Sequence, residues 1–597
     1  MPTPARGRHT PSDLAESRIS SLVSHKLSLE YTSSPIWYAI QTLPALDEAT
    51  NPSNEQLFHR FYANSLTRSI LEAHPQIEPI FRRWADETPD AFLSQLEKNN
   101  DLKQIVLSET PWMVQAETET ADRRRVADFF DRQRTEEALA TLRTQLLKNQ
   151  NADGGWSWMP DYESSPHITM LILQGMGELR SMGCLDSDDE LNAALRKALV
   201  YTDDVYYKEY LEWLKEEAKV SNFWKKRRLA PICINYLYMR SWWTDVPLTA
   251  KTKTSYNYFY EALKRVSHTD DTLMAKALTA LTFHRNGDDK LAADIVRLLG
   301  ESALFSDEMG MYWRDNQSGM FWYNAPVETQ SLLIRAYYEC GANVDGEGRP
   351  VVALMQQWLL KQKQATHWGN SVATAHAVGA LLLGDGQKTL DSTNVAVLTI
   401  GGKHVEPESA EAGTGYFRKD WEAADIRRSM GTVTIDNSAN ASCSWGAVYW
   451  QYFVDIDKMP LAETGFDVKA YYYKVQDDGS LAAIDGPLQV GDKVRVRLRF
   501  TTDRALDYVQ VKAHRAAGLE PVGTRSGRQW NGLSYYLAIE DAATTLYVDR
   551  MEKGDYTVEF DCWATLPGTF LSGTVTLQCL YAPEFRATFS QPNLTIE

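Results

Sequence analysis

The chain has 597 residues, enough for roughly four domains of about 150 residues each. Hydrophobic residues make up 44% and charged residues 24%, which is typical of a globular protein with buried cores. The formal net charge of −17 argues against nucleic acid or an anionic membrane as the main partner, since both repel an acidic surface. Apolar runs fall short of the roughly 20 residues that cross a bilayer. The polar start MPTPARGRHTPSDLAESR lacks the apolar core of a signal peptide, so we expect a soluble chain without an export signal.

Residues 1–26 are expected to form a flexible lead, and residues 27–385 to be mainly helical. Segments such as TEEALATLRTQLLKNQ (135–150) and DTLMAKALTALTFHRNG (271–287) place apolar residues three and four positions apart, as in amphipathic helices. Most of these segments end at a Gly or Asn-Gly, the residues that favour a left-handed helix C-cap.

A turn rich in glycine and tryptophan recurs between the expected helices. It is found at 151–158 (NADGGWSW), 310–322 (GMYWRDNQSGMFW) and 363–377 (KQATHWGNSVATAHA). Helical hairpins repeated in this way bury their apolar faces only against neighbouring hairpins. The irregular repeat length favours a closed ring, an α/α toroid, over an open solenoid. The tryptophans at 156, 158, 313, 322 and 368 fit plugs at the ends of helix pairs, with a binding platform as the alternative.

The pattern changes to β-strands after residue 385. Residues 386–463 hold too few strands, such as NVAVLTIGG and WGAVYWQYFV, to complete a sandwich alone. In DKVRVRLRFTTD (492–503) apolar residues alternate with arginines, and short strands separated by turns continue to the end. Residues 464–597 are therefore expected to form a β-sandwich. The fold class is multidomain α + β, an α/α toroid followed by antiparallel β domains.

The segment NPSNEQLFHRFYANSL (51–66) carries the first candidate site. A cysteine three residues before a glutamine at a helix start closes an internal thioester, because the thiolate attacks the side-chain amide. Here Ser53 stands at the cysteine position, followed by Asn54, Glu55 and Gln56. A hydroxyl is a far weaker nucleophile than a thiolate, so such a site would be chemically silent. Ser53 and Gln56 also fit an ordinary capping box, which stabilises a helix by about 1 kcal/mol.

Other motifs point to weaker alternatives. Asp186, Asp188 and Asp189 form D-x-D-D, the acid of class II terpene cyclases, but the run fits a solvated helix cap better. His367 and His376 share one turn-and-helix unit without a third metal ligand in view. We find no H-E-x-x-H, phosphate-binding loop or G-x-S-x-G motif, and we expect no metal, cofactor or catalytic residue.

The six cysteines form no C-x-x-C pair, which argues against a zinc ribbon. Core packing explains those at 184, 233 and 340. Cys562 and Cys579 fall in neighbouring expected strands, where a disulfide is the alternative to core packing.

Several segments together resemble the C-terminal portion of bacterial alpha-2-macroglobulins. The strand and turn of 26–46, the Ser-Asn-Glu-Gln turn and LLKNQNADGGWSWMP resemble the thioester domain of that family. PLQVGDKVRVRLRFTTDRALDYVQVKAHRAAGLEPV and FDCWATLPGTFLSGTVTLQCLYAPEFRATF resemble its last macroglobulin domain.

The resemblance implies a protease-trapping protein of the cell envelope, periplasm or cell surface, in which a toroid is inserted into a CUB-like β domain. Residues 1–26 would then include the end of an upstream β segment, 27–385 the toroid, 386–463 the CUB-like segment and 464–597 the macroglobulin-like sandwich. The family's thioester cysteine matches Ser53, and its glutamate and glutamine match Glu55 and Gln56, so covalent trapping is expected to be absent.

The upstream macroglobulin domains, bait segment and export signal are missing from this sequence, so we expect a C-terminal portion of a longer parent. It would be a non-enzymatic inhibitor whose partners are proteases, met through that parent, with neither nucleic acid nor membrane insertion involved. The alternatives are an α/α-toroid enzyme of terpene-cyclase or polysaccharide-lyase type, and a tryptophan-rich binding module.

Overall fold

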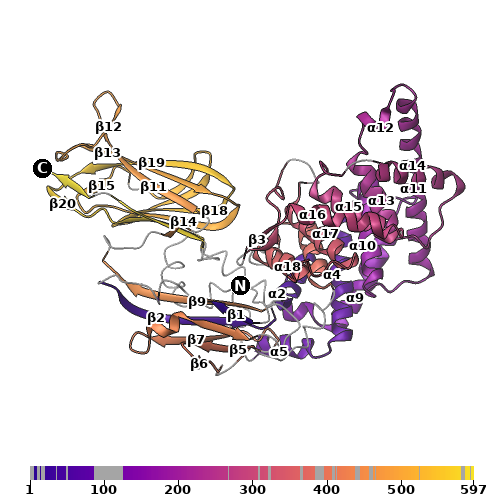
Figure 1. Ribbon diagram of the computed structural model, residues 1–597, viewed down its shortest axis with the longest axis horizontal. Helices are drawn as coiled ribbons and strands as arrows, with labels where there is room; N and C mark the ends of the chain where they lie inside the picture. The colour runs from indigo at the N-terminus through magenta and orange to yellow at the C-terminus, as the bar shows by residue number, and fades with distance from the viewer. Residues whose placement is uncertain are drawn as a thin grey trace.

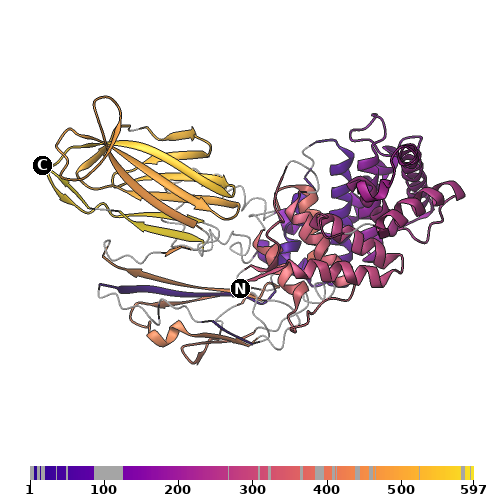
Figure 2. The same cartoon turned by 45° about the horizontal axis from the view of Figure 1, so that its top comes forward.

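A computed structural model provides the structure of the chain (Figure 1). It describes residues 6–9, 14, 21–34, 36–48, 51–86, 125–265, 268–306, 309–319, 324–362, 368–383, 396–406, 410–411, 413–436, 444–455, 462–463, 466–523, 525–579, 585–591 and 593–597. The predicted multidomain α + β class is confirmed, with helices gathered on one side of the molecule and antiparallel sheets on the other (Figures 1 and 2).

Helices between residues 54 and 381 form a closed ring of two layers. The inner layer consists of α4 (Asn54–Ala73), α10 (Pro166–Ser181), α13 (Pro231–Ser241), α15 (Leu273–Arg285), α17 (Pro326–Glu339) and α19 (Ser371–Leu381). Each inner helix contacts the next one in this order, and α19 returns to contact α4. Closure of the ring agrees with the predicted toroid and excludes the open solenoid.

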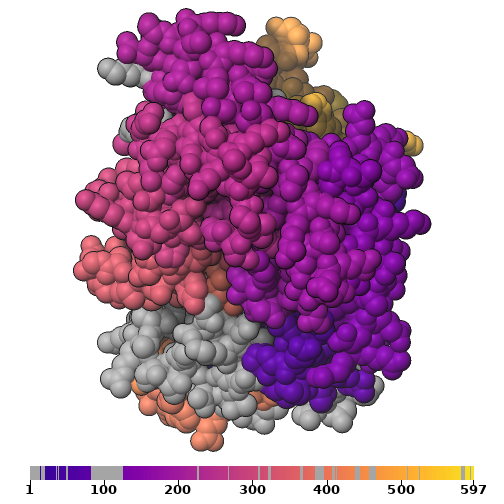
Figure 3. All heavy atoms as spheres, turned by 90° about the vertical axis from the view of Figure 1, so that its right-hand side faces the viewer, coloured from indigo at the N-terminus to yellow at the C-terminus, as the bar shows by residue number. Residues whose placement is uncertain are grey.

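The outer helices each pack on an inner neighbour. They are α9 (Arg132–Lys148) on α4, α11 (Asp189–Glu217) on α10, α14 (Ala250–Arg265) on α13, α16 (Asp289–Glu301) on α15 and α18 (Val351–Lys361) on α17. Shorter or peripheral elements are α2 (Ile36–Ile40), α3 (Leu43–Leu46), α5 (Ile77–Asp86), α12 (Phe223–Lys226), β3 (Leu304–Ser306) and β4 (Gly310–Tyr312). Seen from the side away from the sheets, this helical ring makes up most of the visible surface (Figure 3).

Three buried tryptophans fix the turns between outer and inner helices. The indole Nε1 of Trp156 donates to the Leu146 carbonyl at 2.9 Å, near the end of α9. In the same way, the indole Nε1 of Trp313 donates to the Leu299 carbonyl of α16 at 2.9 Å. The indole Nε1 of Trp368 donates to the Leu359 carbonyl of α18 at 2.7 Å. Each indole bonds a carbonyl in the last turns of the preceding outer helix, where carbonyls lack the regular intrahelical partner. The interpretation of these three residues as plugs is confirmed, and Trp322 lies outside the described residues.

Strands from both sides of the helical ring build a common β domain. β2 (Val23–Thr32) pairs with β7 (Phe417–Glu422) and β9 (Trp445–Phe453), and β1 (Arg6–His9) pairs with β8 (Val433–Asp436). β5 (Val397–Ile400) and β6 (Lys403–His404) complete the second sheet, and the two sheets enclose one apolar core. The strand at 23–32 therefore belongs to this domain, and the helical part begins after it. This moves the expected start of the toroid from residue 27 to the first helix at Ile36.

The C-terminal part is a sandwich of two main antiparallel sheets. One has the order β10 (Ala462–Glu463), β22 (Arg586–Ser590), β21 (Thr574–Cys579), β14 (Leu506–His514), β18 (Ala543–Met551), β17 (Ser534–Ile539) and β16 (Gly527–Trp530). The other has the order β12 (Leu481–Ala483), β11 (Phe466–Val475), β13 (Lys493–Thr502), β19 (Gly554–Ala564) and β15 (Leu519–Pro521). β20 (Gly568–Phe570) pairs with β23 (Leu594–Ile596).

The sandwich core follows the alternation seen in the sequence. Val494, Val496, Leu498 and Phe500 of β13 are each at most 3% exposed. Arg495 and Arg497, which lie between them, pair with Asp561 and Glu559 of β19. Cys562 and Cys579 are buried on strands of different sheets and are not joined by a disulfide, so that alternative is wrong and core packing holds. Of the other thiols, Cys184 and Cys233 are buried, Cys340 is half-buried, and Cys443 lies outside the described residues.

Candidate functional site

The loop before α4 is closed on itself by hydrogen bonds that involve both ends of the Ser-Asn-Glu-Gln motif. Ser53 is 4% exposed and caps the helix, its Oγ accepting from the Gln56 N–H at 3.2 Å. The Gln56 Oε1 accepts from the Asn51 N–H at 2.9 Å. The Asn51 Oδ1 in turn accepts from the Ser53 N–H at 3.0 Å. The predicted cap at Ser53 is confirmed, but Asn51 replaces Gln56 as the acceptor that would complete a reciprocal capping box.

Asn54 ties this loop to the first glycine-tryptophan turn. Its side chain is fully buried, and its Nδ2 donates to the Ser157 carbonyl at 2.9 Å. Its Oδ1 accepts from the Asn149 Nδ2 at 2.8 Å, and its backbone N–H donates to the Trp158 carbonyl at 3.0 Å. Two motifs that lie about a hundred positions apart in the sequence therefore form one rigid unit.

Glu55 faces away from that hydrogen-bond network and lines a cavity of about 1370 Å³ at the N-terminal ends of the inner helices. Partial burial raises the pKa of its carboxyl. Side chains from the first turns of α4, α10, α17 and α19 make up much of the wall. The mouth is lined by two turns of the C-terminal sandwich, through Asp503, Arg504 and Ala505 and through Arg550, Glu552 and Lys553. The motif thus lies beside the cleft between helical ring and sandwich.

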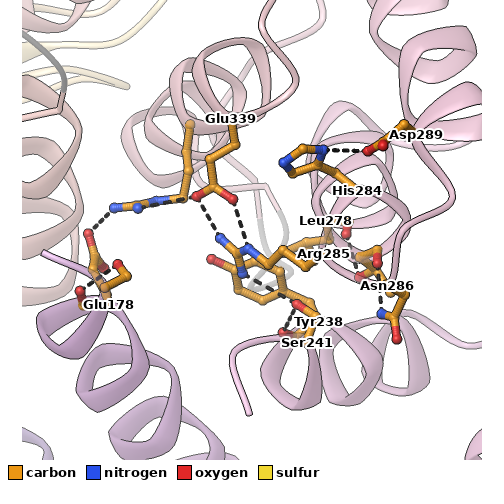
Figure 4. Close-up of polar contacts among 12 residues, drawn as sticks. Glu178, Tyr238, Ser241, Leu278, His284, Arg285, Asn286, Asp289 and Glu339 are labelled. Carbon is orange, nitrogen blue, oxygen red and sulfur yellow. Dashed lines mark hydrogen bonds and ion pairs between the residues drawn. The ribbon is translucent and has the colours of Figure 1, made fainter. Parts of the chain in front are cut away.

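A buried ionic chain crosses the ring beyond this cavity (Figure 4). Glu178 of α10 pairs with Arg335 of α17, and Glu339 receives two bonds of 2.8 Å from Arg285 of α15. Arg335 also lies 3.5 Å from Glu339, and the Arg285 guanidinium stacks 3.4 Å from the centroid of the Trp242 ring. Burial alone would raise the pKa of Glu339, but the two arginines outweigh it and hold the pKa below its usual range. The two carboxylates and the two guanidinium groups cancel, so this ionic chain carries no net charge.

The remaining sequence candidates have structural roles. Asp188 caps α11 through the Leu191 N–H at 2.9 Å and pairs with Arg143, while Asp186 pairs with Arg68. The backbone bond to Leu191 lowers the pKa of Asp188, the opposite of what a proton-donating cyclase acid needs. His376 lies on α19 and lines the cavity, whereas His367 lies outside the described residues.

The sequence did not point to His59, and its interpretation of Trp158 as a plug is wrong, whereas the alternative of a binding platform stays open. His59 is 3% exposed, and burial together with the nearby His376 lowers its pKa to about 3. Trp158 is 49% exposed and stacks on His167, with ring centroids 6.3 Å apart and planes at 12°. The spacing from the buried Trp156 carries no signal for this exposure of Trp158, because residues two positions apart in an extended segment are expected on the same face.

Comparison with known proteins places one domain in a family. Residues 465–584 match the family model described as the bacterial alpha-2-macroglobulin MG10 domain. A search of curated proteins gave no match.

Solved structures with similarity along the whole chain are also alpha-2-macroglobulins. The Escherichia coli protein from domain MG7 to the C-terminus is 12% identical, with 97% of this chain and 78% of that chain covered and a TM-score of 0.35. The Salmonella mutant Y1175G is 14% identical, with 100% and 33% covered and a TM-score of 0.36. The trypsin-activated E. coli protein is 12% identical, with 96% and 34% covered and a TM-score of 0.47. This chain thus spans about a third of the length of the latter two. Its C-terminal sandwich is of the MG10 type, and the resemblance to the bacterial alpha-2-macroglobulin family that the sequence predicted is confirmed there.

Proposed function

We propose that the chain is the C-terminal part of a bacterial alpha-2-macroglobulin that traps proteases without a covalent bond at residue 53. The observation that supports this most is the state of Ser53. Its hydroxyl is a weak nucleophile, is nearly buried and already accepts the Gln56 N–H. The Gln56 carbonyl oxygen, on the group that a nucleophile would attack, is held by the Asn51 N–H. Both partners of a thioester-type closure therefore serve to hold the loop.

The position of the Ser-Asn-Glu-Gln motif beside the sandwich supports a role that depends on contact and motion between the two parts. Glu55 lines the same cavity as two turns of the MG10-type sandwich, so movement of the sandwich would uncover or cover this end of the ring. In the proposed function the interface acts by contact and motion, in a non-enzymatic inhibitor located in the cell envelope. None of the helices in the described part of the chain combines the length and the apolar character that a membrane span requires. The cyclase alternative gains no support, because the acid it needs is solvent-exposed and ion-paired.

Incubation with trypsin, followed by denaturing gel electrophoresis, tests the proposal. We expect no band in which trypsin stays attached to this chain after boiling in detergent. The variant Ser53→Cys provides the matched comparison, because it restores the thiolate in an otherwise unchanged loop. If the loop keeps its ancestral geometry, this variant forms a trypsin adduct or loses ammonia on folding. A boiling-resistant adduct of the wild-type chain would overturn the proposal, and a freely alkylated thiol in the variant would remove the support from loop geometry.

A further inference from the structure

We propose that the cavity at the N-terminal ends of the inner helices binds a neutral oligosaccharide. The inference does not depend on whether residue 53 reacts or on protease trapping. It rests on three properties of the cavity wall: an exposed aromatic platform, polar groups with unused hydrogen-bonding capacity, and the absence of Lys and Arg from the described lining residues on helices.

The platform is formed by Trp158. Unlike Trp156, Trp313 and Trp368, which are at most 3% exposed and plug turns, the Trp158 ring is 49% exposed and lines the cavity. It lies nearly parallel to the His167 ring, which also lines the cavity, and the exposed part of the indole provides the flat surface. A pyranose ring presents an apolar C–H face that packs on such a surface, as apolar ligand groups do on aromatic pocket walls.

The cavity wall also carries polar groups that can form hydrogen bonds with the hydroxyls of a sugar. His59 Nδ1 is buried and has no hydrogen-bond partner among the described residues, although the imidazole lines the cavity. Buried polar atoms are nearly always paired, so this one calls for a group from a ligand or a water. Gln174 Nε2 donates to Asn235 Oδ1 at 2.8 Å, and both amides line the cavity. That bond leaves an acceptor on Gln174 and a donor on Asn235, and a sugar hydroxyl both donates and accepts.

The charges favour a neutral ligand. The described lining residues on helices include Glu55, Glu178 and Glu328 but no Lys or Arg, and Glu178 is neutralised by Arg335, so this wall disfavours an anion. His59 stays uncharged near neutral pH because burial lowers its pKa to about 3. Cationic side chains gather at the mouth, where Arg504, Arg550 and Lys553 of the sandwich lie. An anionic ligand would find its partners at the rim only, whereas the depth of the cavity suits hydroxyl and acetamido groups.

The size fits more than one sugar unit. Small-molecule pockets hold about 300–1,000 Å³, and this cavity measures about 1370 Å³. Its far end is closed by the ionic chain through Glu178. A Cβ at Gly379 would lie 2.4 Å from Glu178 Oε1 and 2.7 Å from Tyr62 Oη, so the glycine lets the wall close around that carboxylate.

The test is calorimetric titration of the full chain with chitotriose, cellotriose and maltotriose, and with trialanine as a peptide of similar length. We expect at least one trisaccharide to bind with saturation at millimolar concentration and trialanine not to bind. Trp158→Ala, which leaves the backbone bond to Asn54 in place, should weaken that binding about tenfold or more. Trp530→Ala is the matched control, since Trp530 is 78% exposed on the β16–β17 hairpin and does not line the cavity.

His59→Phe provides a second variant, in which a ring of similar shape removes the buried nitrogen. It should keep the helical circular dichroism signal and weaken saccharide binding about tenfold. Failure of all three trisaccharides to bind the folded chain would overturn the proposal. So would binding that Trp158→Ala leaves unchanged, or binding of trialanine in preference to the sugars, which would identify a peptide site instead.

Discussion

Removing Arg335 from the ionic chain should cost the helical ring much of its stability. The Arg335 side chain is 6% exposed and its partner Glu178 is 12% exposed. Arg335→Met keeps most of the packing volume but leaves the Glu178 carboxylate without its counter-ion. Breaking a buried pair in this way costs about 3–5 kcal/mol, because a charge stays buried and uncompensated. We therefore expect the free energy of unfolding, measured by urea titration of the helical circular dichroism signal, to fall by about that amount.

Replacing both partners isolates the cause. In Glu178→Leu/Arg335→Met no charge is left unpaired at this position, while Arg285 still balances Glu339, so most of the loss should be recovered. Arg297→Met is the matched control, because its pair with Glu301 is 69% and 59% exposed and should be worth under about 1 kcal/mol. A loss below about 1 kcal/mol for Arg335→Met, or no recovery in the double variant, would refute the reasoning, since a loss of the expected size requires a charge that is both desolvated and unpaired.

Three further predictions concern the loop and the turns around the cavity. His59 has an ordinary pKa of 6.5 when unfolded and about 3 when folded, so its stabilising effect is complete above pH 6.5 and is lost as the pH falls toward 3. Urea titrations should show about 2 kcal/mol of this loss by about pH 5 in wild type but not in His59→Phe; equal pH slopes would contradict it. Asn54→Ala should lower the free energy of unfolding by about 1–3 kcal/mol, because buried groups around it lose their partners; a neutral result would mean that the loop is not anchored there. Trp156→Phe should lower the free energy of unfolding by about 1–3 kcal/mol, because the Leu146 carbonyl loses its indole partner. The control Trp530→Phe should lower it by about 0.5 kcal/mol or less, and similar losses for both variants would refute the plug role.

Local pattern predicted the elements well because each pattern has one dominant cause. The alternation of apolar residues with arginines in 492–503 fixes which face of β13 is buried, and the structure follows it residue by residue. The Gly-Trp turns predicted both the hairpins and their plugs, because a buried indole needs an acceptor and the end of the preceding helix offers one.

Contacts between segments that lie far apart in the sequence could not be predicted from local pattern. The expected domain boundary at residue 27 places most of the strand at 23–32 in the toroid, yet the partners of this strand lie about 400 positions away at 417–422 and 445–453. The cavity was missed for a similar reason. His59, Trp158 and Asn235 come from three separate hairpins, and only closure of the ring brings them to one wall.

Intact mass spectrometry of the wild-type chain, before and after methylamine treatment, tests the central claim most directly. That claim is that Ser53 and Gln56 hold the loop by hydrogen bonds and form no reactive bond. The predicted result is the mass calculated from the sequence, unchanged by the amine. A mass lower by about 17 Da, the loss of ammonia on closure of a side-chain amide, or a gain of methylamine would contradict it.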